Sequence, residues 1–196
     1  MNNLIIHPRD SSTDFLKPIY APLKNKTVIT GGISKTELRE VIKEHDRVIM
    51  LGHGSPGGLL TMQQFGTTNG FIIDYSMVDV LKEKKDNVFI WCNADQFVYD
   101  YDLEGFYSGM FISEIDEAIY YDFYDIEPSE IDESNYWFAE IVSRYINHPL
   151  NVLYDNLIQD YRELARTNPI AQFNLERLYI SHETKKFDSL CNTKLF

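Results

Sequence analysis

Two short apolar runs each end in a side chain that could take part in nucleophilic catalysis. Val-Ile-Met-Leu-Gly-His-Gly at residues 48–54 ends in His53 and Gly54, and Val-Phe-Ile-Trp-Cys at residues 88–92 ends in Cys92. A cysteine thiolate attacks the carbonyl carbon of an amide or ester, and a histidine imidazole carries the proton to the leaving group. The two side chains can do this only if they project into one shared cleft.

The glycine after the histidine adds to this signal. A glycine leaves its backbone N–H unhindered, so that the N–H can help to form an oxyanion hole, and the backbone N–H of the cysteine is the natural second donor. Gly54 and Cys92 supply these two donors. Losing one such donor typically costs about 3 kcal/mol of transition-state stabilisation, so the glycine is part of the predicted site.

The two runs predict strands that are buried on both faces, as in a parallel sheet. Val48 to Leu51 is apolar throughout, with charged residues before it and glycine after it, and residues 88–91 repeat this pattern. Ligands and reacting groups of parallel sheets lie just beyond the carboxyl ends of the strands. We therefore expect His53 and Cys92 to meet at this edge of the sheet.

The remaining pattern predicts an α/β fold, a three-layer α/β/α sandwich with a mostly parallel sheet and a C-terminal helical portion. We expect one domain over residues 1–196. The expected strands cover residues 4–7, 27–30, 48–51, 88–92, 106–112 and 175–180, with a hairpin of residues 59–62 and 70–73. The expected helices begin near residues 11–14, at Ser34 with a capping box to Glu37, at Asp74, at Ser134 and at Pro149.

Composition narrows the possible partners. The chain of 196 residues is 44% hydrophobic, which is enough for a packed core, and its formal net charge is -12. A surface this acidic repels the phosphates of nucleic acid but tolerates a basic peptide. We see neither a signal peptide nor an apolar run long enough to span a bilayer, and we expect a soluble cytoplasmic protein without membrane contact.

These residues resemble the caspase-like superfamily of cysteine peptidases, which includes caspases, legumains, gingipains, separases and bacterial CHAT-type relatives. In that family an apolar strand ends in His-Gly, a hairpin and a helix follow, and a second apolar strand ends in the nucleophilic cysteine. The resemblance implies that His53 is the general base and acid, that Cys92 is the nucleophile and that Gly54 is an oxyanion donor. It implies hydrolysis of peptide bonds in a peptide or protein substrate.

The resemblance also bears on specificity. Relatives that cut after Arg or Lys hold an acidic residue in the primary specificity pocket, and Asp95, just past the cysteine strand, is the candidate for that role. Asp95 is explained equally well as an ordinary loop residue or helix-capping residue. Trp91 departs from the family, which often has Ala or Ser before the cysteine, and the caspase pentapeptide around the nucleophile is absent.

Two other functions stay open. The chain is compatible with a catalytically inactive relative that kept the fold as a binding or interaction module, and with a flavodoxin-like protein that binds a small molecule at the same strand ends. A strand-terminal cysteine such as Cys92 is often a core residue, and His53 and His7 are each compatible with a hydrogen-bonded structural histidine. His182 and Cys191 lack zinc-ligand spacing, and we expect no metal and no cofactor.

Overall fold

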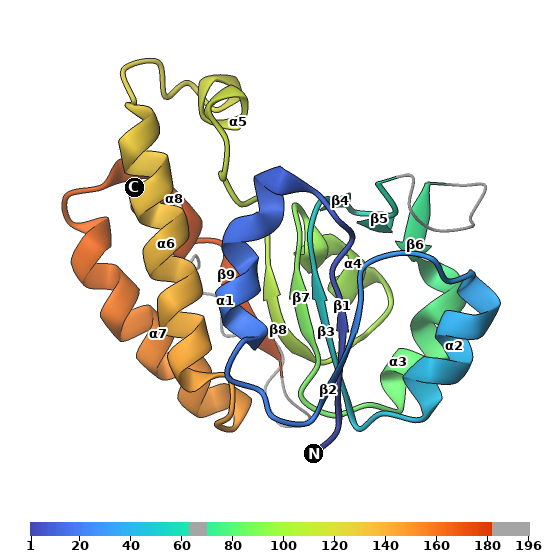
Figure 1. The fold of residues 1–196 in the computed structure, drawn as a ribbon. Coiled ribbons are helices and arrows are strands. Elements are labelled where there is room, and N and C mark those ends of the chain that lie inside the picture. Colours follow the sequence, from blue (N-terminus) through green and yellow to red (C-terminus); the bar gives the residue numbers. More distant parts are fainter. Residues whose placement is uncertain (63–69, 182–196) are drawn as a thin grey trace.

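The sequence folds around a six-stranded sheet with helices on both of its faces (Figure 1). The computed structural model describes residues 1–62 and 70–181. Within them the strand order is β2-β1-β3-β7-β8-β9, in which the first five strands are parallel and β9 is antiparallel to β8. The strands of this sheet are β1 (Asn3–Ile6), β2 (Lys26–Ile29), β3 (Arg47–Leu51), β7 (Val88–Ile90), β8 (Gly105–Ser108) and β9 (Leu178–Ser181).

A small antiparallel sheet follows β3 and confirms the expected hairpin. It consists of β4 (Gly54–Ser55), β5 (Gly58–Leu60) and β6 (Phe71–Ile73). The link at residues 63–69 lies outside the described residues, as does the tail with His182 and Cys191. The chain returns to the main sheet through η2 (Tyr75–Met77), whose N-cap is Asp74 as expected, and α3 (Val78–Lys82).

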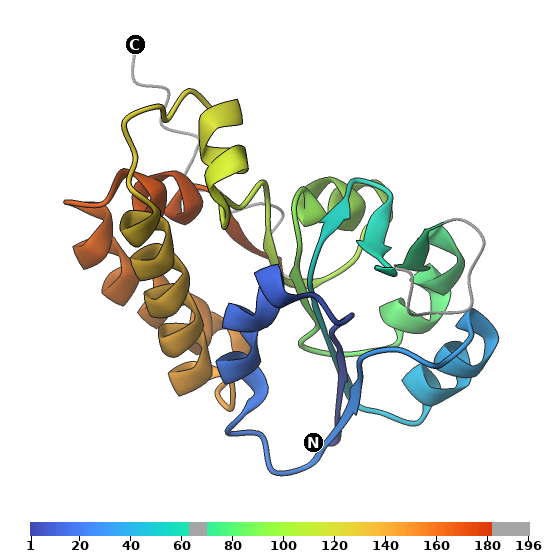
Figure 2. The same cartoon turned by 45° about the horizontal axis from the view of Figure 1, so that its top comes forward.

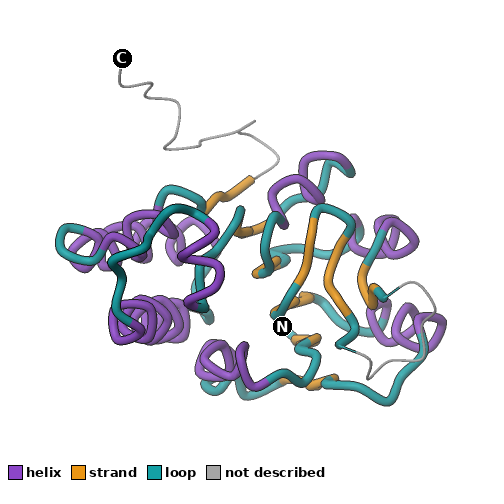
Figure 3. Tube along the Cα trace, turned by 90° about the horizontal axis from the view of Figure 1, so that it is seen from above, coloured by secondary structure: helices purple, strands orange, loops and turns teal. Residues whose placement is uncertain are grey.

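The two faces of the sheet have separate apolar cores. Alternate residues of β3 point to opposite faces, so Ile49 and Leu51 belong to one core and Val48 and Met50 to the other. The first core packs on η1 (Ser11–Leu16), α1 (Lys17–Tyr20), α6 (Pro128–Tyr145) and α7 (Leu150–Ala165). The second packs on α2 (Lys35–Lys43), α3 and α4 (Ala94–Asp100). Figure 3, which looks along the strands, shows the helices around the sheet.

These observations confirm an α/β fold with a mostly parallel sheet and a largely helical last third. That last third contains α6, α7, α8 (Pro169–Leu175) and β9. The helix α5 (Ile115–Tyr120) lies beyond the carboxyl ends of the strands, near η1 (Figure 2).

Several expected boundaries are wrong, for local reasons. The helix expected from Ser134 begins at Pro128, because Glu127 and Glu130 form a capping box there. Ser134 is buried inside that helix, where its hydroxyl pairs with Tyr161 Oη at 2.6 Å. The first helical segment is capped by Asp10. β8 ends at Ser108 and β9 starts at Leu178, so both strands are shorter at one end than their apolar runs.

Candidate functional site

The two strands that carry the candidate residues are direct neighbours. β3 and β7 are parallel, and Leu51 pairs with Ile90. His53 follows Leu51 by two residues, and Cys92 follows Ile90 by the same offset. The two residues therefore lie at equivalent positions just beyond the ends of adjacent strands, at the edge where parallel sheets keep their sites.

The contacts place both side chains on the same face of the sheet. Both residues lie beyond the strand ends, because β3 ends at Leu51 and β7 ends at Ile90, two residues before the expected end at Cys92. That face carries the core under α1, α6 and α7. His53 meets Ser12 of η1, and Cys92 meets the carbonyl oxygen of Phe111, whose ring belongs to the same core.

His53 is held by two residues at the start of η1, the N-cap Asp10 and Ser12. Its Nε2 lies 2.6 Å from Ser12 Oγ, and Ser12 Oγ lies 2.9 Å from Asp10 Oδ1. The other carboxylate oxygen of Asp10, Oδ2, lies 3.9 Å from the same ring nitrogen. The Ser12 hydroxyl has one proton, and because the Asp10 carboxylate can only accept, Ser12 donates to Asp10 and accepts from Nε2–H. A neutral His53 then has its lone pair on Nδ1, which is the atom free to act as a base.

Asp10 is well placed for this role because it also caps the helix. Its Oδ1 accepts the backbone N–H of Ser12 at 3.0 Å. This hydrogen bond, with a further contribution from the Ser12 hydroxyl, lowers the pKa of Asp10. Asp10 is therefore an anion at neutral pH.

Cys92 lies in a setting that keeps its thiol protonated. Its sulfur lies 3.6 Å from the carbonyl oxygen of Phe111 and 3.7 Å from Oε1 of Glu117 at α5. Burial, followed by the negative charge of Glu117, raises the pKa of Cys92 to about 12. At pH 7 a thiol with this pKa is ionised in about one molecule in 10⁵.

The predicted partners therefore share an edge and a face of the sheet but have different contacts. Within residues 1–62 and 70–181, no hydrogen bond joins His53 to Cys92. Their surroundings are connected through one aromatic pair, because the Phe15 ring of η1 stacks on the Phe111 ring at 6.3 Å.

Gly54 has a packing role that the sequence did not indicate. A Cβ at this position would lie 2.1 Å from Cδ1 of Trp91 and 2.7 Å from the carbonyl oxygen of Gly58. The Trp91 indole also donates its N–H to the carbonyl oxygen of Ser55 at 3.1 Å. The bulky Trp91 thus points into the core opposite the Cys92 side chain and fixes β4 against the sheet.

Asp95 and His7 have partners other than His53 among the described residues. Asp95 is half-buried in the first turn of α4, close to Gly109, and burial raises its pKa although Arg177 opposes the shift. Its Oδ1 is buried without a hydrogen-bond partner among the described residues. His7 is a structural histidine, since both ring nitrogens have hydroxyl partners, Tyr20 at 3.2 Å and Thr13 at 3.1 Å.

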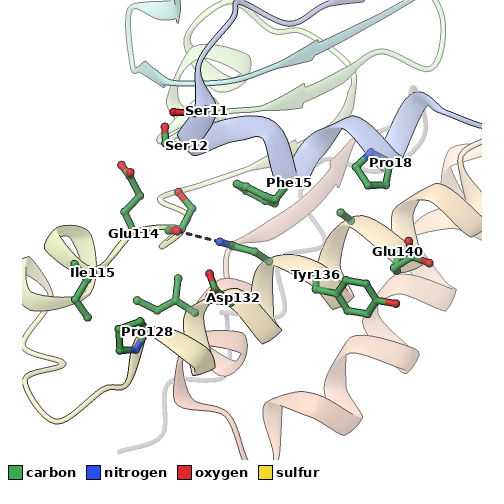
Figure 4. A pocket seen from close by; sticks show the side chains of 14 residues that line it. Ser11, Ser12, Phe15, Pro18, Glu114, Ile115, Pro128, Asp132, Tyr136 and Glu140 are labelled. Atoms are coloured by element: carbon green, nitrogen blue, oxygen red, sulfur yellow. Dashed lines mark hydrogen bonds between the residues drawn. The ribbon is translucent and has the colours of Figure 1, made fainter.

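A groove of about 550 Å³ begins beside Ser12 and Ser113 (Figure 4). One wall is η1 and the start of α1, the other is α6, and the start of α5 closes one end. Ser12, the partner of His53, lines the groove. Ser113 also lines it, and its backbone N–H donates to Glu117, which contacts Cys92. His53 therefore lies one contact behind the groove wall, through Ser12, and Cys92 lies two contacts behind it, through Ser113 and Glu117.

The described residues contain no group of three or more His, Cys, Asp or Glu side chains that could hold a metal ion. In the same part of the chain, no helix combines the length and apolar character that a membrane crossing requires. The chain matches no family model, no curated protein and no solved structure.

Sequence reasoning missed three residues of this site: Asp10, Ser12 and Glu117. Asp10 and Ser12 stand in the Asp-Ser-Ser-Thr-Asp segment, which carried only the signal of a helix N-terminus. Glu117 is one of many acidic residues between residues 95 and 133. Each of the three acquires its role through a contact that the local pattern does not encode.

Proposed function

We propose that the chain is a cysteine peptidase of the caspase-like type, with Cys92 as nucleophile and His53 as general base and acid. The observation that carries the proposal is the equal offset of His53 and Cys92 from the paired residues Leu51 and Ile90. The order of elements supports it, since β3, His53-Gly54, a small sheet, α3, β7 and Cys92 follow one another as in that family. The Nε2–H tautomer of His53 supports it further, because Nδ1 is left as the base.

In this reaction the Cys92 sulfur attacks the carbonyl carbon of the scissile peptide, and its proton passes to His53. The oxyanion forms beside the backbone N–H groups of Gly54 and Cys92. The C–N bond then breaks, and His53 returns the proton to the leaving amine. Water hydrolyses the thioester with His53 as base, which releases the acid and restores the thiol.

The contact between Cys92 and Glu117 makes the described structure a resting form under this proposal. A carboxylate beside the thiol opposes thiolate formation. Glu117 belongs to α5, which lies beyond the strands, and its Oε2 also accepts the N–H groups of Ser113 and Glu114. Activation then requires that Glu117 moves away from the sulfur or is neutralised.

Thiol labelling tests the proposal. The wild-type protein and the variants His53→Ala, Glu117→Gln and Cys92→Ala would be treated with a peptidyl acyloxymethyl ketone, and the labelled residue identified by mass spectrometry. The proposal expects labelling at Cys92, more in Glu117→Gln and at least tenfold less in His53→Ala. Equal labelling of Cys92 in the wild type and His53→Ala would contradict the dyad.

A second function is favoured by the high pKa of Cys92 itself. An inactive module of the same fold would bind a peptide without cleaving it, and its cysteine would be an ordinary half-buried residue. This module predicts no Cys92 labelling in any variant, Glu117→Gln included, while ligand binding survives both His53→Ala and Cys92→Ala.

A further inference from the structure

We infer that the groove between η1–α1 and α6 binds an extended peptide segment in which a Lys or Arg side chain is flanked by apolar residues. This inference names a substrate class for the proposed peptidase. It rests on the proposed function only in that cleavage of the bound peptide requires peptidase activity. Binding itself requires neither His53 nor Cys92.

The floor of the groove is apolar. Phe15, Ile115, Ile131 and Ala139 line it, and Ile131 and Ala139 are buried there. Tyr136 also lines it, yet 56% of its surface is exposed. An exposed aromatic ring beside an apolar floor is a surface that gains from being covered by a partner.

The rim of the groove is acidic. In Figure 4, Glu114 and Glu140 lie toward the two ends of the groove, and Asp132 lies between them. No Lys or Arg lines the groove, and within the described residues none of these three carboxylates forms an ion pair with Lys or Arg. A row of uncompensated carboxylates selects a cationic ligand and rejects an anionic one.

A buried amide in the wall lacks one hydrogen bond. Asn135 lines the groove with 6% of its surface exposed, and its Nδ2 donates to the carbonyl oxygen of Ser113 at 2.9 Å. That bond fixes the orientation of the amide. Its Oδ1 has no partner among the described residues and is shielded from solvent, although buried amide oxygens are nearly always hydrogen-bonded. A peptide N–H supplies the missing donor only where binding shifts the groove wall around Asn135.

The groove also reaches both halves of the candidate dyad. Its lining includes Ser12, which contacts His53, and Ser113, which donates to Glu117 beside Cys92. A peptide that displaces Ser113 or the start of α5 acts on the Glu117 contact, which adds to burial in opposing ionisation of the thiol. The same binding event can therefore position a substrate and relieve the resting state.

Fluorescence anisotropy of the full-length Cys92→Ala protein tests the inference without cleavage of the probe. The probe is a fluorescein-labelled peptide Ala-Leu-Lys-Phe-Lys-Leu-Ala, and the matched peptide has Glu in place of both Lys residues. We expect saturable binding of the first peptide, at least tenfold weaker binding of the second, and weakening at high salt. Equal binding of the two peptides would overturn the inference.

Variants locate the binding. Asp132→Asn with Glu140→Gln should weaken the Lys peptide about tenfold or more, whereas Asp155→Asn, an exposed single-charge change on α7, should have no effect. Asn135→Leu should weaken binding about tenfold, because the amide and its hydrogen bond to Ser113 in the groove wall are both lost. If Asn135→Leu does not fold, the Asp132→Asn and Glu140→Gln double variant is sufficient to test the inference. Unchanged affinity of this double variant for the Lys peptide would show that the peptide does not bind in the groove.

The two proposals fail separately. If the groove binds the Lys peptide but Cys92 is not labelled, the peptide-binding inference is supported and the peptidase proposal is contradicted. If labelling depends on His53 but the Asp132 and Glu140 variant has unchanged peptide affinity, the peptidase proposal is supported and the peptide-binding inference is contradicted.

Discussion

The Cys92 thiol points at a carboxylate, with its sulfur 3.7 Å from Oε1 of Glu117. A general base normally assists a catalytic thiol, whereas here a second negative charge opposes its ionisation. Glu117 accepts backbone N–H groups through its other oxygen. The contact therefore belongs to an ordered helix start, and it links the reactivity of Cys92 to the position of α5.

Removing the charge of Glu117 should make Cys92 more reactive. Glu117→Gln keeps an oxygen that can accept the N–H groups of Ser113 and Glu114 but removes the negative charge near the sulfur. The pKa of Cys92 should fall from about 12, although burial, the larger cause, keeps it above the ordinary value. Alkylation by iodoacetamide at pH 8 should accelerate by about threefold to tenfold, since one pKa unit changes the thiolate fraction tenfold.

The control for this experiment is Asp116→Asn, which removes a neighbouring exposed carboxylate of α5. Its alkylation rate should equal that of the wild type. An unchanged rate in Glu117→Gln, measured with Cys191 replaced by Ser, would show that burial alone protects the thiol.

The Ser12 hydroxyl should determine the tautomer of His53. In the wild type the Nε2–H form is favoured, because Ser12 donates its hydroxyl hydrogen bond to Asp10 and can only accept from Nε2. Ser12→Ala removes this acceptor, so the neutral ring should shift toward a mixture of both tautomers. Long-range ¹H–¹⁵N spectra of ¹⁵N-histidine protein report the tautomer directly. Ser11→Ala, which changes an adjacent groove residue, is the control and should leave the His53 signals in place.

Much of the fold follows from local pattern, and the contacts of the site do not. The apolar runs before His53 and Cys92 predict neighbouring parallel strands, and the Ser34–Glu37 capping box forms as expected. The hydrogen bond between Ser12 and His53 spans 41 residues, and that between Cys92 and Glu117 spans 25. Such contacts depend on how η1 and α5 pack over the strand ends. No residue spacing within either segment specifies this.

The start of α6 shows a different reason for error. Glu127 caps this helix, and glutamate is outside the group of Ser, Thr, Asp and Asn that favours this position. Ser134 is in that group, but its burial and its hydrogen bond to Tyr161 place it in the helix interior. A preferred N-cap residue type beside an apolar stripe therefore does not by itself mark a helix boundary.

Burial of His7 should make the stability of the protein depend on pH. Burial lowers the pKa of His7 to about 4, whereas an unfolded histidine has a pKa near 6.5. Between these values the unfolded chain binds more protons, so the contribution of neutral His7 is complete above about pH 6.5 and is lost as pH falls toward 4. The slope from one such group is at most about 1.4 kcal/mol per pH unit.

Urea unfolding at pH 7 and pH 5 measures this dependence. In His7→Gln the contribution of His7 is absent, so the difference in unfolding free energy between the two pH values should shrink. His148→Gln removes an exposed histidine and should leave the difference unchanged. An identical pH dependence in His7→Gln and the wild type would place the acid sensitivity elsewhere.

A methyl group at Gly54 should destabilise the protein through Trp91. In Gly54→Ala the new Cβ would lie 2.1 Å from Cδ1 of Trp91 and 2.7 Å from a backbone oxygen of Gly58, so the indole and β5 must both shift. Overpacking of this kind typically costs about 1–3 kcal/mol.

Gly57→Ala is the control, because the nearest atoms to its Cβ would be the ring of Phe71 and the Ser55 side chain, at 3.1 Å or more. Thermal unfolding should show a clearly lower midpoint for Gly54→Ala than for Gly57→Ala. If Gly54→Ala instead keeps the wild-type midpoint and loses only the labelling of Cys92, the glycine serves the oxyanion hole and Trp91 does not require it.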